Sequence, residues 1–302
     1  MAEEGFTRHH AGRAGTSLPS RSRVLARRFF RTSRGRAGFA LLALVVLVAF
    51  AGPAVCSWSW TDKDFTAFLA PPSDDHWLGT LQTGADVYAV TLRGMRRSLI
   101  VGLLAAVIST GLAAVVGAFA GYFLGWTERA LMWITDLLLV LPAFLILAIM
   151  SPLFSNGTWW IFVVVLAMFL WMVTAKVVRS MTISLRGREY IRAARYMGVR
   201  PVTIIFRHVL PNLSSLLIVD ATLNVSGAIL TETSLSYFGF GIRPPDVSLG
   251  TLIADGSKTA LYTPWTFWFA AGLLIVTVLA VNLVGDALRD AFDPSSGGPS
   301  NV

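Results

Sequence analysis

The sequence predicts an all-α integral membrane protein with six membrane-spanning helices. Of its 302 residues, 55% are hydrophobic and only 14% are charged, a balance that a soluble domain of this size does not have. Its apolar runs reach about 20 residues, the length that a helix needs to cross a hydrocarbon core of roughly 30 Å. We expect the six spans at 38–57, 98–123, 131–154, 158–177, 212–238 and 265–286.

The N-terminal region, residues 1–37, is polar and rich in arginine, glycine and serine. We expect disorder up to about residue 20, because such a composition cannot bury enough apolar surface to fold. The arginines that follow are expected to lie along the inner leaflet. The first span, 38–57, has nearly full membrane length and is followed by further spans, so we interpret it as a retained anchor and not as a cleaved signal peptide.

Most of the 25 lysines and arginines fall in segments that share one side of the membrane. These segments are the N-terminal tail, the connections after the second and fourth spans, and the end of the sixth span. The positive-inside rule therefore places both termini in the cytoplasm. We interpret the net charge of +8 as a sign of topology and of contact with membrane lipid, and not of nucleic-acid binding. Six basic residues remain on the opposite side: Lys63, Arg93, Arg96, Arg97, Arg243 and Lys258.

The first external segment, 58–97, is rich in aspartate. A divalent metal site is one interpretation of these carboxylates. A solvated loop face is favoured, because no histidine or ligand spacing supports metal binding. We therefore expect neither a metal nor another cofactor on this chain. The aspartates are Asp62, Asp64, Asp74, Asp75 and Asp86.

The second and third spans contain residues that bear on helix packing. Gly117, Gly121 and Gly125 recur every four residues and favour close packing within the chain. Pro142 predicts a kink in the third span. Asp136, in the same span, is expected to face protein, water or a partner charge, because a carboxylate at that depth is costly. An internal hydrogen bond or ion pair near the cytoplasmic mouth is favoured over a role as a gate or pathway residue.

The fifth span has the most polar face. Asp220, Asn224, Gly227, Thr231 and Ser234 recur at helical spacing, and a polar stripe on a spanning helix faces either a water-filled path or another helix. We favour the path as a hypothesis. The candidate path residues of the whole chain are Asp136, Asp220, Asn224, Thr231 and Glu232.

The segment 188–211 is basic and amphipathic and lies between two apolar runs. A short helix is expected to end at Gly198 in the left-handed conformation, and Pro201 is expected to open a further helical turn. Pro211 is expected to break the chain before the fifth span. The small Ala193 and Ala194 would let another protein approach closely, as a docking helix for a soluble partner requires.

Ala193-Ala194, Gly198 and the run His208-Val209-Leu210-Pro211 resemble the signature loop of bacterial ABC-importer permeases. In that family, the type I permeases, the loop inserts into a cleft on the ATPase subunit as a coupling helix between spans four and five. The family usually has an acidic residue before the two alanines, where this chain has Arg192. The docking residues that the resemblance implies are Glu189, Tyr190, Ile191, Arg192, Ala193, Ala194, Arg195, Gly198, Leu210 and Pro211.

Further stretches are similar to the C-type subunits of the dipeptide/oligopeptide branch of this family. They include 76–80, 228–241 and 282–294, so the resemblance extends over most of 38–294. The external segment of about 40 residues also favours the C-type subunit, because B-type partners have a longer insertion. The permease core is accordingly expected at 98–294, with a disordered tail at 295–302.

The resemblance implies one half of the translocation path of an ATP-driven importer of di- or oligopeptides in a bacterial inner membrane. Its implied partners are a homologous B-type permease, two cytoplasmic ATPase subunits that hold ATP and Mg²⁺, and an external solute-binding protein. Similar permeases import nickel, haem or other small solutes. A proton-coupled secondary transporter is the alternative from another class. We find no enzyme constellation in the sequence, because its Gly-Ser-Lys-Thr at 256–259 lacks the spacing of a phosphate-binding loop.

Overall fold

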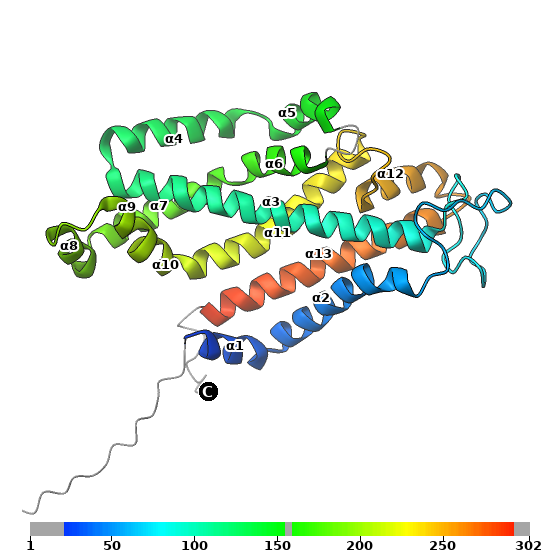
Figure 1. The fold of residues 1–302 in the computed structure, drawn as a ribbon, viewed down its shortest axis with the longest axis horizontal. Helices are drawn as coiled ribbons and strands as arrows, with labels where there is room; N and C mark the ends of the chain where they lie inside the picture. The colour runs from blue at the N-terminus through cyan, green and yellow to red at the C-terminus, as the bar shows by residue number, and fades with distance from the viewer. Residues whose placement is uncertain (1–20, 155–158, 293–302) are drawn as a thin grey trace, which may run out of the picture.

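The computed structural model describes residues 21–154 and 159–292, and within these ranges the protein is helical and has no strand. The expected disordered tails, 1–20 and 295–302, lie outside the described residues. Figure 1 shows the main helices, which run roughly along the long axis of the molecule. They are α1 (Arg21–Arg31), α2 (Ser33–Ala51), α3 (Val87–Phe123), α4 (Gly125–Val140), α5 (Ala143–Met150), α6 (Trp159–Leu170), α7 (Met172–Arg186), α8 (Glu189–Tyr196), α9 (Pro201–Ile204), α10 (Leu210–Asn212), α11 (Ser214–Tyr237), α12 (Leu249–Thr259) and α13 (Trp265–Phe292).

Four helical segments among the described residues are individually long and apolar enough to cross a membrane: Ser33–Ala54, α3, α11 and α13. Two further pairs, α4 with α5 and α6 with α7, meet the same criteria only when each pair is taken together. If each bent pair counts as one span, the chain has up to six spans. The described part of the molecule is therefore an all-helical membrane protein, as the sequence predicts.

The bends in these pairs have different origins. The axes of α4 and α5 differ by 77° where Leu141 and Pro142 interrupt the helix, which confirms the predicted kink. The second bend, of 46°, separates α6 from α7 near Trp171. The indole of Trp171 donates to the carbonyl of Met168 at 2.9 Å, but no proline marks this position and the sequence analysis did not predict the bend.

Helix α3 begins eleven residues earlier than the expected second span. The side chain of Asp86 caps it by accepting a hydrogen bond from the amide of Ala89 at 2.9 Å, and the first turns are buried. At about 1.5 Å per residue, the 37 residues of α3 extend about 55 Å, more than the roughly 30 Å of a hydrocarbon core. One or both ends of α3 therefore project beyond the apolar part of the membrane.

Two glycines of the predicted small-residue face allow α3 to approach α7 closely. A Cβ atom at Gly117 would lie 2.4 Å from the carbonyl oxygen of Ala175, and one at Gly121 would lie 2.5 Å from that of Arg179. This contact confirms the expected packing within the chain. Gly125 is not part of it, because it opens α4 with a positive φ of 59° and no atom crowds it.

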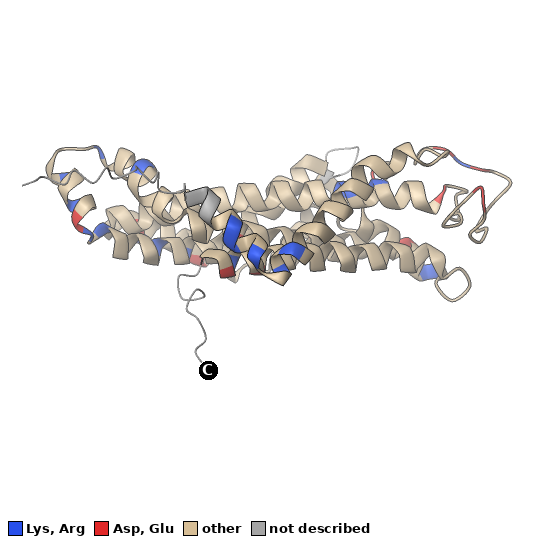
Figure 2. Ribbon diagram, turned by 90° about the horizontal axis from the view of Figure 1, so that it is seen from below, with Lys and Arg blue, Asp and Glu red and all other residues tan. Residues whose placement is uncertain are grey.

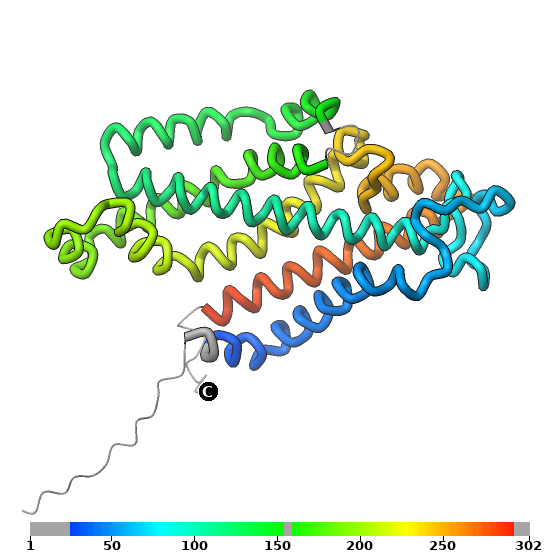
Figure 3. Tube along the Cα trace, in the orientation of Figure 1, coloured from blue at the N-terminus to red at the C-terminus, as the bar shows by residue number. Residues whose placement is uncertain are grey.

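The N-terminal helices pack on the C-terminal one. Figure 3 shows the blue tube of α2 beside the red tube of α13, and the two helices are in extensive contact. A Cβ atom at Gly38 would lie 2.9 Å from Leu283, so the backbones approach closely there. Phe29 of α1 is buried with Ala287 and Ala291 of α13. Helix α1 is thus held at the end of α13.

Candidate functional site

The segment 188–211, called the coupling loop below, forms one extreme end of the molecule. Figure 1 shows α8 beyond the end of α3, with α9 beside the ends of α3 and α7. Figure 2 shows lysine and arginine residues gathered at this end and along α1. A rigid, cationic projection of this kind is suited to contact a partner outside the membrane.

A glycine in the left-handed conformation ends α8. Gly198 has φ +76°, and its amide donates to the carbonyl of Arg195 at 3.1 Å. The amide of Val199 donates to the carbonyl of Ala194, also at 3.1 Å. These two bonds form a Schellman motif, in which the C-terminal carbonyls of the helix are satisfied by the turn that follows. The predicted conformation of Gly198 is confirmed.

One face of α8 is fixed to the body of the molecule. Ile191 and Ala194 are 1% and 4% exposed, and they join a cluster that includes Tyr122 of α3 and Val178 of α7. Ala194 therefore packs against its own chain, which differs from the expectation that both alanines face a partner. The same cluster contains Ile204, Ile205, Val209 and Leu213, from the rest of the coupling loop and its junction with α11.

The opposite face of α8 is open. Ala193 lies between the exposed Arg192 and Arg195, and the end of the helix presents Tyr196 and Met197 at 83% and 75% exposure. Aromatic, methionine and arginine side chains are enriched at protein interfaces. Of the other candidate docking residues, Glu189, Tyr190 and Pro211 are exposed and Leu210 is half-buried.

The coupling loop joins α11 through an irregular but continuous helical path. A π-helical turn spans Ile205–Val209, and the amide of Leu213 donates to the carbonyl of Val209 at 3.2 Å. Pro211 lies in the first turn of the short α10, where its missing N–H removes no helical bond, so it does not break the chain as expected. The π-helical turn, a feature that is often found at functional sites, was not predicted from the sequence.

The candidate path residues lie in three separate regions of the structure. The first is centred on Asp220 of α11, whose carboxylate accepts hydrogen bonds from Thr110 of α3 at 3.1 Å and Thr174 of α7 at 2.7 Å. It also accepts one from Asn224 at 2.9 Å. Asp220 and Asn224 remain half-buried. This group, called the Asp220 cluster, ties three helices together and keeps a partly accessible polar surface.

The second place is Glu232, which lies on another face of α11. Its side chain is fully buried and accepts hydrogen bonds from Ser98 of α3 at 3.1 Å and Ser236 at 2.6 Å. Thr231 is half-buried, and its hydroxyl donates to its own helix at the carbonyl of Gly227. Glu232 and Thr231 are neighbours in sequence that point in different directions.

The third place is Asp136 of α4, which forms an ion pair with Lys176 of α7 at 2.5 Å. Their side chains are 58% and 44% exposed. This ion pair is one of the two interactions that the favoured sequence interpretation allowed. Glu128 and Arg179 form a second ion pair between the same two helices.

A buried histidine organises the segment between α2 and α3. His76 is 3% exposed, and its Nδ1 lies 2.9 Å from the carboxylate of Asp86, the residue that caps α3. Its ring packs against Trp58 at 4.7 Å, and its Nε2 lies 3.5 Å from Asp64. The hydroxyl of Thr66, by donating a hydrogen bond, holds the pKa of Asp64 below its ordinary value. This arrangement around His76 was not predicted from the sequence.

The described residues contain no group of three or more His, Cys, Asp or Glu side chains that could hold a metal ion. The aspartates of this segment instead serve the loop itself. Asp64 accepts from the hydroxyl of Thr66 at 2.6 Å, and Asp62 accepts from the amide of Ser59 at 2.9 Å.

We expect His76→Ala to loosen the segment 58–86, because it removes the contact with Trp58 and leaves the buried Asp86 without one partner. Hydrogen exchange of backbone amides in this segment should become about tenfold faster, the equivalent of about 1.4 kcal/mol. His208→Ala, at the coupling-loop end, is the matched control and should leave exchange in 58–86 unchanged. Unchanged exchange in the His76 variant would contradict the assigned role.

Comparison with known proteins gives a consistent result. Residues 113–297 match the family described as "Binding-protein-dependent transport system inner membrane component". The chain is 53% identical over 282 residues to the oligopeptide transport system permease protein OppC of Mycobacterium tuberculosis (strain ATCC 25618 / H37Rv), an alignment that covers 93% of this chain and 97% of the relative. It is 36% identical over 293 residues to a putative peptide permease protein of Brucella suis biovar 1, covering 94% and 97%. It is 33% identical over 269 residues to OppC of Bacillus subtilis (strain 168), covering 88% and 87%.

Proposed function

The chain belongs to the family of binding-protein-dependent transport system inner membrane components, and we propose that it is a permease subunit of an ATP-driven importer of di- and oligopeptides. The alignment with a named oligopeptide permease over 93% of the chain carries this proposal. Two other relatives are named as an oligopeptide and a peptide permease. Multiple apolar helices agree with a multi-pass protein of the inner membrane.

In the proposed assembly this chain pairs with a homologous B-type permease, and the two form the translocation path between them. Two cytoplasmic ATPase subunits bind and hydrolyse ATP, and an external solute-binding protein delivers the peptide. The chain itself hydrolyses nothing and binds no cofactor. Both termini and the coupling loop lie in the cytoplasm, in agreement with the positive-inside distribution of arginine and lysine.

The coupling loop transmits the movement of the ATPases to the membrane. Its buried face connects α8 directly to α3 and α7, so a displacement of α8 is passed to spanning helices as a rigid-body motion. Its exposed face, around Ala193, Tyr196 and Met197, contacts the ATPase.

The complete transporter, reconstituted in vesicles with a peptide-loaded binding protein, tests this function. We expect uptake of a labelled tripeptide that requires ATP and both ATPase subunits. Uptake that persists without the ATPases and stops when the proton gradient is removed would instead identify a secondary transporter. ATP-dependent uptake of nickel or haem without peptide uptake would support the ATP-driven mechanism but contradict the proposal that the substrate is a peptide.

Ala193→Trp should prevent docking of the ATPase, because the bulky indole would project from the exposed face of α8. We expect at least about a tenfold loss of ATPase subunits recovered with the permease, or roughly 1.4 kcal/mol or more of binding free energy. Thr203→Trp, at another exposed position of the coupling loop, is the control: it adds the same bulk and should leave recovery of the ATPase subunits unchanged. Recovery of the complex at wild-type yield with Ala193→Trp would contradict the docking assignment.

A water-filled path along α11 predicts that cysteines at accessible positions react with small aqueous thiol reagents. We expect Asn224→Cys and Thr231→Cys to be labelled in at least one nucleotide state of the transporter. Ser226→Cys, at a buried position of α11, is the control and should stay unlabelled. Protection of both test positions in every nucleotide state would indicate helix packing in place of a path.

A further inference from the structure

Three arginines, Arg93, Arg96 and Arg97, lie in the N-terminal part of α3, and two of them approach the carboxylate of Asp246. Arg97 forms an ion pair with Asp246 and lies over the ring of Trp159 at 4.3 Å. Arg93 approaches the same carboxylate only to 3.9 Å, and its Nε is buried without a hydrogen-bond partner. Arg96 is exposed and has no ion-pair partner in the described ranges. This surface therefore has uncompensated positive charge.

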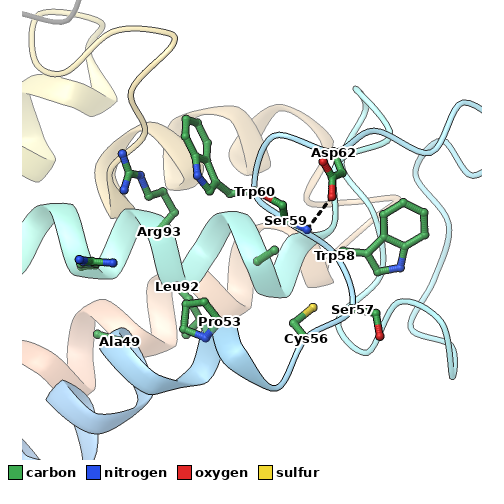
Figure 4. A pocket seen from close by; sticks show the side chains of 12 residues that line it. Ala49, Pro53, Cys56, Ser57, Trp58, Ser59, Trp60, Asp62, Leu92 and Arg93 are labelled. Atoms are coloured by element: carbon green, nitrogen blue, oxygen red, sulfur yellow. Dashed lines mark hydrogen bonds between the residues drawn. The ribbon is translucent and has the colours of Figure 1, made fainter.

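A pocket of about 320 Å³ opens beside Arg93 and Arg96, between α3 and the chain that leaves α2. Figure 4 shows the Arg93 side chain next to Trp60, and the guanidinium lies 4.6 Å from the indole centroid. Asp62 also lines the pocket, but Figure 4 shows its carboxylate bonded to Ser59 and not to an arginine. The pocket thus offers guanidinium groups and indole rings to an anionic ligand.

An apolar groove of about 440 Å³ extends from this region along the bundle. One wall is formed by every fourth residue of α2 and a second by one face of α3, and residues of α11 and α13 also line the groove. Phe50 joins the groove to the cationic surface, because it lines the groove and the guanidinium of Arg96 lies over its ring at 4.7 Å. The residues of the two walls are Leu42, Val46 and Phe50 on α2, and Leu99, Leu103 and Val107 on α3.

The length of this surface matches one leaflet of a membrane. Val107 lies eleven residues beyond Arg96 on α3, a distance of about 16 Å at 1.5 Å per residue. Half of a hydrocarbon core of roughly 30 Å is about 15 Å. Cationic and indole side chains lie at the position of the headgroups, where aromatic residues gather in membrane proteins.

We propose that this surface is a binding site for a phospholipid of the leaflet opposite the α8 end, which is the outer leaflet in the proposed orientation. Arg96 and Arg93 bind the headgroup phosphate, and one acyl chain lies in the groove between α2 and α3. Guanidinium groups bind phosphate oxygens with charge-assisted hydrogen bonds. Because any lipid tail fills an apolar groove in a bilayer, the arginines supply the selectivity.

Retention of lipid by the purified transporter tests the proposal without reference to transport. The delipidated complex is titrated with phosphatidylglycerol or with diacylglycerol of the same acyl chains, and retained lipid is counted by native mass spectrometry. We expect selective retention of phosphatidylglycerol. Arg96→Gln should weaken it at least about tenfold, while Arg96→Lys keeps most of it because the charge remains. Lys258→Gln, an exposed cation at the same end, should behave as the wild type.

Leu103→Trp provides a second test that leaves the charges unchanged. An indole in the groove should displace the acyl chain and lower retention of phosphatidylglycerol while the complex stays assembled. Equal retention of diacylglycerol and phosphatidylglycerol, or wild-type retention by Arg96→Gln, would overturn the proposal. So would displacement of the lipid by excess inorganic phosphate, which would indicate a site for a soluble anion. Cross-linking of Leu103→Cys to a helix of the B-type permease would show that a protein occupies the groove.

Discussion

Gly198→Val should leave the transporter assembled in the membrane and hydrolysing ATP while peptide uptake falls at least about tenfold. Gly198 has φ +76°, and no atom lies within 4 Å of the position that a Cβ would take. The obstacle to valine is therefore the backbone conformation and not a lack of space. A β-branched residue in the left-handed region is strained by about 1–2 kcal/mol or more. The chain relieves this strain by leaving that conformation, which breaks the Schellman motif and changes the direction of α8.

The expected separation of hydrolysis from uptake follows from where the strain acts. The two hydrogen bonds of the motif, from Gly198 and Val199, fix the angle between α8 and the chain that returns to α11. If that angle is no longer fixed, ATPase movement still occurs but is not passed on to the spanning helices. ATP hydrolysis and peptide uptake must therefore be measured on the same vesicles.

Two variants make this test specific. Gly198→Asn should retain most of the uptake, because asparagine tolerates the left-handed conformation. Gly187→Val should also retain it, because Gly187 lies at the end of α7 with φ −76° and needs no special backbone freedom. Wild-type uptake by Gly198→Val would contradict the coupling role of this turn. Equal loss in all three variants would show that the region tolerates no side chain, which would also contradict the conformational argument.

Local chemistry allowed the sequence to predict some features well. Pro142 predicts a kink because proline lacks the amide that a helix needs, and Gly198 predicts a helix end because glycine adopts positive φ without strain. The bend near Trp171 has no such residue, although α6 and α7 both pack on α3. The conformations that one residue type imposes were predictable, while those that tertiary contacts impose were not.

In the candidate site, too, local features were predictable and features that depend on tertiary contacts were not. A helical pattern places Ala193 and Ala194 about 100° apart on α8, but which of them faces the body of the chain depends on α3 and α7. The partners of His76 come from a nonrepetitive loop, ten and twelve residues away, where no periodic pattern exists. The sequence predicted that the segment 188–211 is an amphipathic docking segment, and the structure was needed to separate its inner and outer faces.

Glu232 lies beside the polar stripe of α11, and its contacts could not be predicted from the sequence. It follows Thr231 directly, so it is turned by about 100° from the polar stripe of α11. The carboxyl group of Glu232 lies among serine hydroxyls, and these hydroxyls themselves accept hydrogen bonds from backbone amides. Ser98 accepts from Leu249 at 3.2 Å, and Ser236 accepts from Ile242 at 3.1 Å. Through these contacts Glu232 links α3 and α11 to the start of α12.

Because the network is shared, removing its central member should destabilise several elements together. We expect Glu232→Ala to lower the free energy of unfolding by on the order of 3 kcal/mol, through lost hydrogen bonds and a small cavity. Titration of the detergent-solubilised transporter with sodium dodecyl sulfate, followed by circular dichroism, measures this change. Glu232→Gln keeps an acceptor for one serine, so it should lower the free energy of unfolding by less than half as much as Glu232→Ala.

Asp136→Ala is the matched control, because it also removes a carboxylate from a spanning helix. Its ion pair with Lys176 is largely exposed within the chain, so we expect a change below about 1 kcal/mol. The comparison also separates the two roles that Glu232 can have. If Glu232→Ala abolishes peptide uptake while the free energy of unfolding stays at the wild-type value, Glu232 belongs to the translocation path. If unfolding becomes easier and the surviving protein still transports, its role is to hold α3, α11 and α12 together.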